Sequence, residues 1–143
     1  MSRIINMEGA GKERTRLSRS AVLALRELMR QSQADSLTRD LAAYLALVLD
    51  EITETIDPTV AAWEKRGYWL KADRFRLEWE WCKRSSERLS RAVIQEDWVE
   101  VAQEAAQVAM RLNSIKLPVR HRLGTPWVGA WDRLKSRQTG NPA

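Results

Sequence analysis

A single apolar stripe between residues 37 and 56 constrains the fold of this chain more than any other feature. Its positions recur every three or four residues for nearly three heptads, with Tyr44 and Leu45 sharing one position: Leu37, Leu41, Tyr44/Leu45, Val48, Ile52 and Ile56. A repeat of this period places its members on one face of an α-helix, whereas a half-buried strand alternates with a period of two. Ser36 precedes the stripe and is a residue type that favours the N-cap position. The sequence therefore predicts a long amphipathic helix that begins at Ser36.

The rest of the chain favours the same class of structure. With 6 Gly and 4 Pro among 143 residues, the chain has few of the residues that the turns of an all-β fold require. Apolar residues at helical spacing predict three further helices over residues 17–30, 68–94 and 96–115, and Ser18 or Ser20 can cap the first of them. We therefore expect an all-α fold of one domain, with a four-helix antiparallel bundle over residues 17–115.

Pro58 and Gly67 interrupt the pattern after the first stripe. Pro58 lacks a backbone donor and biases Asp57 away from the α region. Either the helix kinks there, or Asp57 caps a new helix with Pro58 at its first position. Gly67 suits the C-cap of a short piece over residues 58–66, and a break there lets the chain reverse direction. We favour a break at Gly67, followed by one long helix over residues 68–94.

Positive charge is concentrated at the two ends of the chain. Residues 1–20 carry five basic and two acidic side chains, and residues 114–143 carry six and one. Because the net charge is +5, the intervening body is mildly acidic. We predict a flexible basic arm over residues 1–16 and a basic tail over residues 116–143. Such ends either contact a polyanion or lie on the acidic body.

Aromatic residues gather between residues 63 and 81, where four of the seven tryptophans lie. At 100° per residue, one apolar sector of this helix contains Leu70, Leu77 and Trp81, joined by Trp63 if the helix is continuous. A second sector, about 120–140° away, contains Tyr68, Phe75 and Trp79. One sector is enough to pack a helix into a bundle. The second predicts a further partner, either the C-terminal segment or another subunit.

The basic tail contains a short amphipathic pattern of its own. Trp127, Trp131 and Leu134 fall at i, i+4 and i+7, Thr125 can cap a helix, and Pro126 suits its first position. A helix with this face docks either on its own bundle or in the groove of another protein. We favour docking on its own bundle, because large apolar faces are usually covered within the chain.

The sequence contains no pattern that supports catalysis or cofactor binding. His121 and Cys82 are the sole residues of their types, so no cluster is available for zinc or iron. The GAGK segment at 9–12 lacks the first glycine and the final Ser or Thr of a phosphate-binding loop. The acidic run at 50–57 lacks the Glu-x-x-His motif of di-metal bundles. We expect no catalytic residue, cofactor, metal ion or small-molecule substrate.

These observations predict a non-enzymatic helical-bundle interaction protein, which is a scaffold, an adaptor or a small subunit of an assembly. We expect a protein partner, or a homo-oligomer formed through the aromatic helix 68–94. The candidate interface residues are Tyr68, Phe75, Trp79, Trp127, Trp131 and Leu134. The longest apolar run, at 41–49, is too short to span a bilayer, and a single cysteine fits a reducing compartment. We therefore expect a cytoplasmic protein that does not bind membranes.

An alternative prediction is a small nucleic-acid-associated helical protein that uses its basic ends. Cationic side chains neutralise phosphates, and nearby aromatic rings stack on bases. The pattern has low specificity, because no helix-turn-helix, zinc-finger or basic-zipper signature accompanies it. The candidate nucleic-acid contacts are Lys12, Arg14, Arg16, Arg120, Arg122, Arg133 and Lys135.

Overall fold

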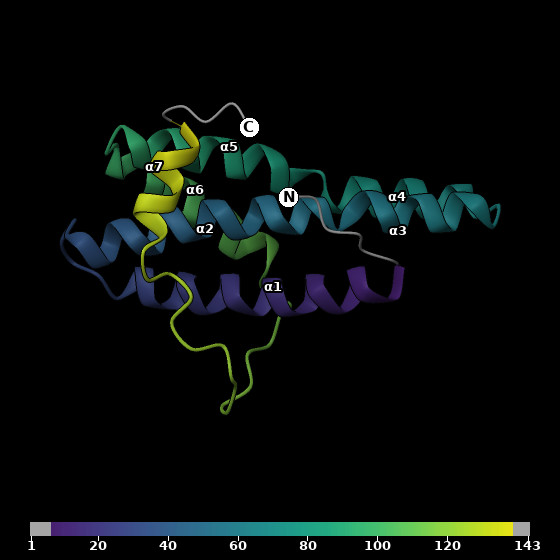
Figure 1. Cartoon of the computed structure of the whole chain (residues 1–143), viewed down its shortest axis with the longest axis horizontal. Helices are drawn as coiled ribbons and strands as arrows, with labels where there is room; N and C mark the ends of the chain where they lie inside the picture. Colours follow the sequence, from purple (N-terminus) through teal and green to yellow (C-terminus); the bar gives the residue numbers. More distant parts are fainter. Residues whose placement is uncertain (1–6, 139–143) are drawn as a thin grey trace.

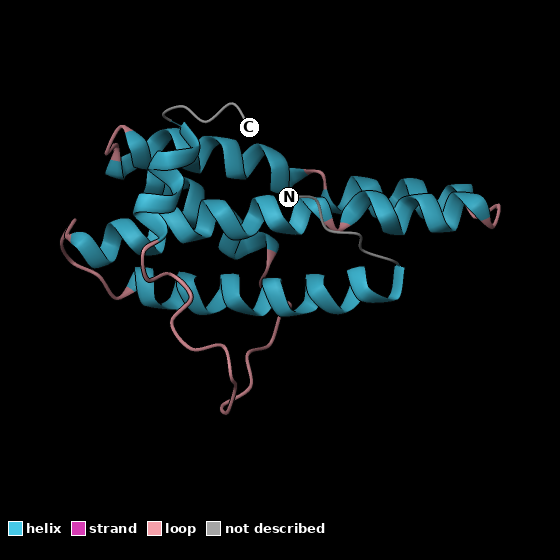
Figure 2. Cartoon of the chain, viewed as in Figure 1, coloured by secondary structure: helices cyan, strands magenta, loops and turns pink. Residues whose placement is uncertain are grey.

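A computed structural model describes residues 7–138, and these residues form helices, turns and loops without any strand (Figure 2). The predicted all-helical class is therefore confirmed for the described part of the chain. No helix within residues 7–138 is both long enough and apolar enough to cross a bilayer.

Helix α2 (Ser36–Glu54) occupies the centre of the molecule. It packs against α1 (Met7–Met29), α5 (Trp81–Ile94) and α7 (Ala130–Gln138), while α6 (Trp98–Arg111) packs on α5 and touches α1 (Figure 1). Every residue from 41 to 49 is buried. This continuous apolar run exists because a helix that is covered on all sides must be apolar all round. With one helix surrounded in this way, the specific four-helix antiparallel bundle predicted from the sequence is not confirmed.

Helices α3 (Ile56–Lys65) and α4 (Trp69–Trp79) form a helical hairpin that projects beyond the other helices (Figure 1). Gly67 lies in the turn between them with φ of +81°, a conformation that glycine adopts at low cost. The predicted break at Gly67 is thus confirmed. The preceding interruption falls at Thr55, so Pro58 lies in the first turn of α3, where its missing N–H is not needed.

Several predicted helix ends are wrong by a few residues. The side chain of Asp35, rather than Ser36, caps α2 by accepting a hydrogen bond from the backbone N–H of Thr38. Helix α6 is shorter than the predicted 96–115: it begins after Asp97, whose carboxylate accepts the N–H of Glu100, and it ends at Arg111. The predicted helix over 68–94 is also interrupted, by a turn at Glu80 that separates α4 from α5.

The predicted flexible arm over residues 1–16 is wrong for residues 7–16, which form the first turns of α1. Residues 1–6 lie outside the described range. Ala10 is completely buried and Arg14 contacts α3, so tertiary contacts hold this segment helical despite its glycines, each of which costs about 1 kcal/mol in a helix. Consequently Ser18 and Ser20 lie buried inside α1 instead of capping it.

The C-terminal segment docks on its own helical body, as expected. Trp127, Ala130 and Leu134 are buried and belong to the main core. The cap of α7 comes from α2 and not from the predicted Thr125, because the carboxylate of Asp40 accepts the backbone N–H groups of Gly129 at 3.3 Å and Trp131 at 2.9 Å. One side chain of the central helix therefore fixes where α7 begins.

Candidate interaction surfaces

The hairpin has a small apolar core of its own. Ile56 and Val60 of α3 are buried against Ala72 of α4, and three aromatic rings cover them: Trp63, Phe75 and Trp79. The rings of Trp63 and Phe75 meet edge to face with centroids 5.1 Å apart, a favourable arrangement for aromatic pairs. The ring centroids of Phe75 and Trp79 are 6.4 Å apart, and the same distance separates the centroids of Trp79 and the buried Trp81. A continuous row of rings thus connects the hairpin to the main core.

Arg14 attaches the hairpin to α1. Its Nη1 donates hydrogen bonds to the carbonyl oxygen and hydroxyl of Thr55 and to the hydroxyl of Thr59, each at 3.3 Å. Its guanidinium lies 4.6 Å from the ring centroid of Phe75 and 5.8 Å from that of Trp79. Burial lowers the pKa of Arg14, and the charge of Glu78 opposes that shift. Arg14 was predicted to contact nucleic acid, but its half-buried side chain is a structural link between helices.

The roles predicted for the two apolar sectors of the aromatic helix are wrong for its residues in α4, whereas Trp81 at the start of α5 is buried in the main core as predicted. Phe75 and Trp79, candidate interface residues, pack into the hairpin core, while Tyr68 remains 54% exposed at the turn. Leu70 and Leu77 were assigned to the bundle core, yet each is 65% exposed. The reason is that α4 leaves the main core and packs on α3, which turns the Phe75 sector inward.

The outer face of α4 (Trp69, Leu70 and Leu77) is consequently an apolar surface on a projecting element. Trp69 is 62% exposed, close to the value for the two leucines. Single exposed apolar side chains are common, but several on one short helix mark a candidate protein-binding surface. The seven-residue spacing of Leu70 and Leu77 predicts that they share a helix face, but it does not distinguish a core face from an exposed one.

The tail residues predicted for an interface are covered by the chain itself. Trp127 and Leu134 are buried in the main core and are not available to a partner. Trp131 is half-buried, and two cations flank its ring: the guanidinium of Arg39 at 5.9 Å and Nζ of Lys135 at 5.3 Å from the centroid. The tail therefore closes the core around α2 instead of presenting an apolar face.

Four of the predicted nucleic-acid contacts come together in one groove. Lys12 and Arg16 of α1 form one wall, and Arg120 and Arg122 of the loop between α6 and α7 form the other. Two further basic residues, Arg19 and His121, line the same groove, which has a volume of about 480 Å³. Lys12, Arg16 and Arg19 follow one another at i, i+4 and i+7. Their shared face could have been found from the sequence had α1 been extended to Met7.

The remaining predicted contacts lie elsewhere. Arg133 donates hydrogen bonds to the backbone oxygens of Val128 and Pro126, so it stabilises the turn before α7. Lys135 lies beside the ring of Trp131. The two parts of the tail therefore lie in different places. Helix α7 is held on the acidic body, where Arg137 also forms an ion pair with Asp50 at 2.9 Å. The 118–123 segment faces α1.

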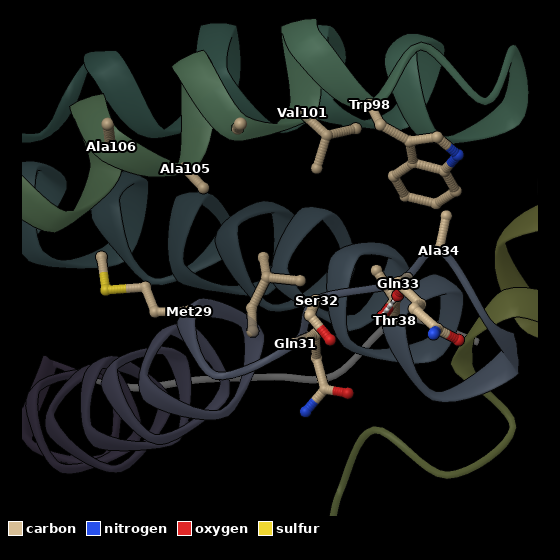
Figure 3. A pocket seen from close by; sticks show the side chains of 12 residues that line it. Met29, Gln31, Ser32, Gln33, Ala34, Thr38, Trp98, Val101, Ala105 and Ala106 are labelled. Carbon is tan, nitrogen blue, oxygen red and sulfur yellow. Dashed lines mark hydrogen bonds between the residues drawn. The ribbon is translucent and has the colours of Figure 1, made fainter.

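Two other clefts differ in the side chains that line them. A pocket of about 380 Å³ between α6 and the residues that follow α1 is lined by Trp98, Val101, Ala105 and other residues without a titratable group (Figure 3). A smaller cleft of about 160 Å³ has three arginines around Glu104, whose buried carboxylate accepts a hydrogen bond from Ser85 at 2.7 Å. The one hydroxyl–carboxylate pair of this cleft, Ser85 with Glu104, is formed by two buried side chains.

The single cysteine and the acidic residues do not form a reactive centre. Burial raises the pKa of Cys82 to about 12, so its thiol stays protonated at neutral pH. Within residues 7–138 no three His, Cys, Asp or Glu side chains are grouped so that they could hold a metal ion. Burial also raises the pKa of Glu51, which Arg16 partly opposes.

Comparison of the chain with protein-family models, with curated proteins and with solved structures gave no match. Arguments about function therefore depend on the surfaces themselves.

Proposed function

We propose that this chain is a non-enzymatic interaction protein that self-associates through the outer face of α4. The observation that carries this proposal is the exposure of Leu70 and Leu77, each 65% accessible on a helix whose other side packs on α3 through Ala72, Phe75 and Trp79. Water is a poor environment for both side chains, and covering them is favourable by about 25 cal/mol for each Å² of apolar surface removed.

The spacing of the two leucines favours a second copy of the chain as the partner. Suppose that two α4 helices pair antiparallel about a two-fold axis between positions 73 and 74. Leu70 of each copy then faces Leu77 of the other, so the apolar surface is complementary to itself, as an isologous dimer interface requires. At 100° per residue, Asp73 and Arg74 lie on opposite sides of the line from Leu70 to Leu77, and the two-fold axis places Asp73 beside Asp73 of the other copy.

The hairpin is also suitably placed and rigid. It extends beyond the other helices, so that two copies can approach without a clash between their bodies (Figure 1). Its aromatic core and the Arg14 contacts hold α4 in place before association. A preorganised element loses less conformational entropy on binding than a flexible one.

The test compares the oligomeric state of two double variants by sedimentation velocity and by size-exclusion chromatography with light scattering. Leu70→Ser/Leu77→Ser removes four leucines from each dimer. At about 1 kcal/mol for the exposed part of each leucine, the dissociation constant should rise about 10³-fold. The matched control, Val99→Ser/Met110→Ser, removes two equally exposed apolar side chains from α6 and should leave association unchanged.

Charge removal tests the antiparallel pairing itself. Asp73 lies across the two-fold axis from Asp73 of the other copy, so Asp73→Asn removes a like-charge repulsion and should strengthen the dimer. The proposal is wrong if the wild-type chain is a monomer up to millimolar concentration. It is also wrong if the leucine variant associates as strongly as its control.

A further inference from the structure

The basic groove between α1 and the loop before α7 is built by two segments about a hundred residues apart in the sequence. Lys12, Arg16 and Arg19 extend over seven residues of α1, about 10 Å at 1.5 Å per residue. The opposing wall consists of residues 118–123, in the loop that runs past α1 after α6 (Figure 1). Thr15, Pro118 and Leu123 complete the lining.

The cations of this groove differ in how far the protein neutralises them. Glu13 forms an ion pair with Arg16. Within residues 7–138, Arg19, Arg120 and Arg122 have no ion-pair partner. The backbone N–H of Leu123 donates a hydrogen bond to Nδ1 of His121 at 3.4 Å. Like charges that converge in a concave site produce a local positive potential, which an anion relieves.

We propose that this groove binds the phosphate backbone of a nucleic acid. Cations placed successively along two turns of a helix match a chain of phosphates better than one isolated anion. Arginine forks donate two hydrogen bonds to a phosphate group, and four of the six basic residues here are arginines. A concave groove also admits a strand, whereas a flat bilayer would meet the loop tip first.

The lining further implies which features of the nucleic acid are recognised. None of the nine lining residues is a tryptophan, tyrosine or phenylalanine, so the groove has no platform on which bases can stack. Contacts to phosphate carry no sequence information by themselves. Binding in the groove is therefore independent of base sequence and strongly dependent on salt. This site is independent of the hairpin, and its test does not rely on self-association.

The experiment measures fluorescence anisotropy of a labelled 20-nucleotide single-stranded DNA with the full chain between 25 and 300 mM salt. Four to five phosphate contacts imply a slope of about −3 for log K against log salt. Arg120→Gln/Arg122→Gln should reduce the slope by about 1.4 and weaken binding roughly 50-fold at 50 mM salt. Both arginines are exposed, so the fold should be unaffected.

Two controls locate the site and identify its ligand. Arg26→Gln/Lys83→Gln removes the same charge from exposed positions outside the groove and should change affinity less than threefold. Vesicles containing phosphatidylserine test an anionic membrane as the partner. The proposal is overturned if the DNA does not bind at 25 mM salt, if the control weakens binding as much as the groove variant, or if groove-dependent binding occurs with vesicles and not with DNA.

Discussion

Replacing Arg14 with alanine tests how the hairpin is attached to α1. The change removes three hydrogen bonds that share one nitrogen and two ring contacts at 4.6 and 5.8 Å. Hydrogen bonds to a charged group contribute about 1.5 kcal/mol, and partly desolvated cation–π contacts about 1–2 kcal/mol. We expect the free energy of unfolding to fall by about 3 kcal/mol, which corresponds to roughly 10 °C in Tm for a chain of this length.

The effect should also be local. Thermal unfolding followed by circular dichroism gives the total loss of stability, while amide hydrogen exchange should show faster exchange in α3, α4 and the first turns of α1 than in α2. Arg26→Ala is the matched control, because Arg26 is exposed on the same helix. Arg14→Lys keeps the charge but loses the planar guanidinium, and it should retain less than half of the stabilisation.

One result would refute this reasoning. If Arg14→Ala and Arg26→Ala change the free energy of unfolding by the same amount to within about 0.5 kcal/mol, Arg14 does not join the hairpin to α1. The helical state of residues 7–16 would then need another cause, such as the packing of Ala10 alone.

Two further predictions concern single residues. Gly67→Ala should destabilise the chain by about 1–2 kcal/mol, because φ is +81° at this position. Gly11→Ala should stabilise it by about 1 kcal/mol, because an alanine favours the helix and the added Cβ would meet only Arg14 Nη2 at 3.9 Å. The midpoints of urea denaturation measure both changes. Burial raises the pKa of Cys82 to about 12, so its thiol should not react with a thiol reagent at pH 8 until the chain is unfolded. The contribution of the buried, protonated thiol to the free energy of unfolding should be complete below pH 9 and be lost as the pH rises toward 12, which urea denaturation at several pH values measures.

Elements whose partners lie in the main core were predictable from the sequence. The stripe of α2 and the faces of α5 and α6 each meet the same core, so periodicity alone locates them. The turn at Gly67 was predictable because few residues other than glycine adopt a positive φ. Pattern reasoning is sufficient where local preference and tertiary packing agree.

The hairpin could not be predicted in the same way. The sequence pattern alone does not show which of the two apolar sectors is buried, because that depends on the position of α3. The interruption at Glu80 has no glycine or proline to mark it. The exposed face with Leu70 and Leu77 therefore looked like a core face, and the ring cluster with Phe75 looked like an interface.

The segment from Lys12 to Arg19 explains why composition alone could not assign the basic residues of α1. Arg14 lies on the helix face of Ala10 and Leu17, whereas Lys12, Arg16 and Arg19 share the opposite face. One face joins the hairpin to α1, and the other forms the wall of the basic groove. The basic residues from Lys12 to Arg19 therefore have two roles, and the helix face on which each residue lies determines its role. That phase became apparent only once tertiary contacts had extended α1 to Met7, so the assignment of each arginine depends on the packing of Ala10.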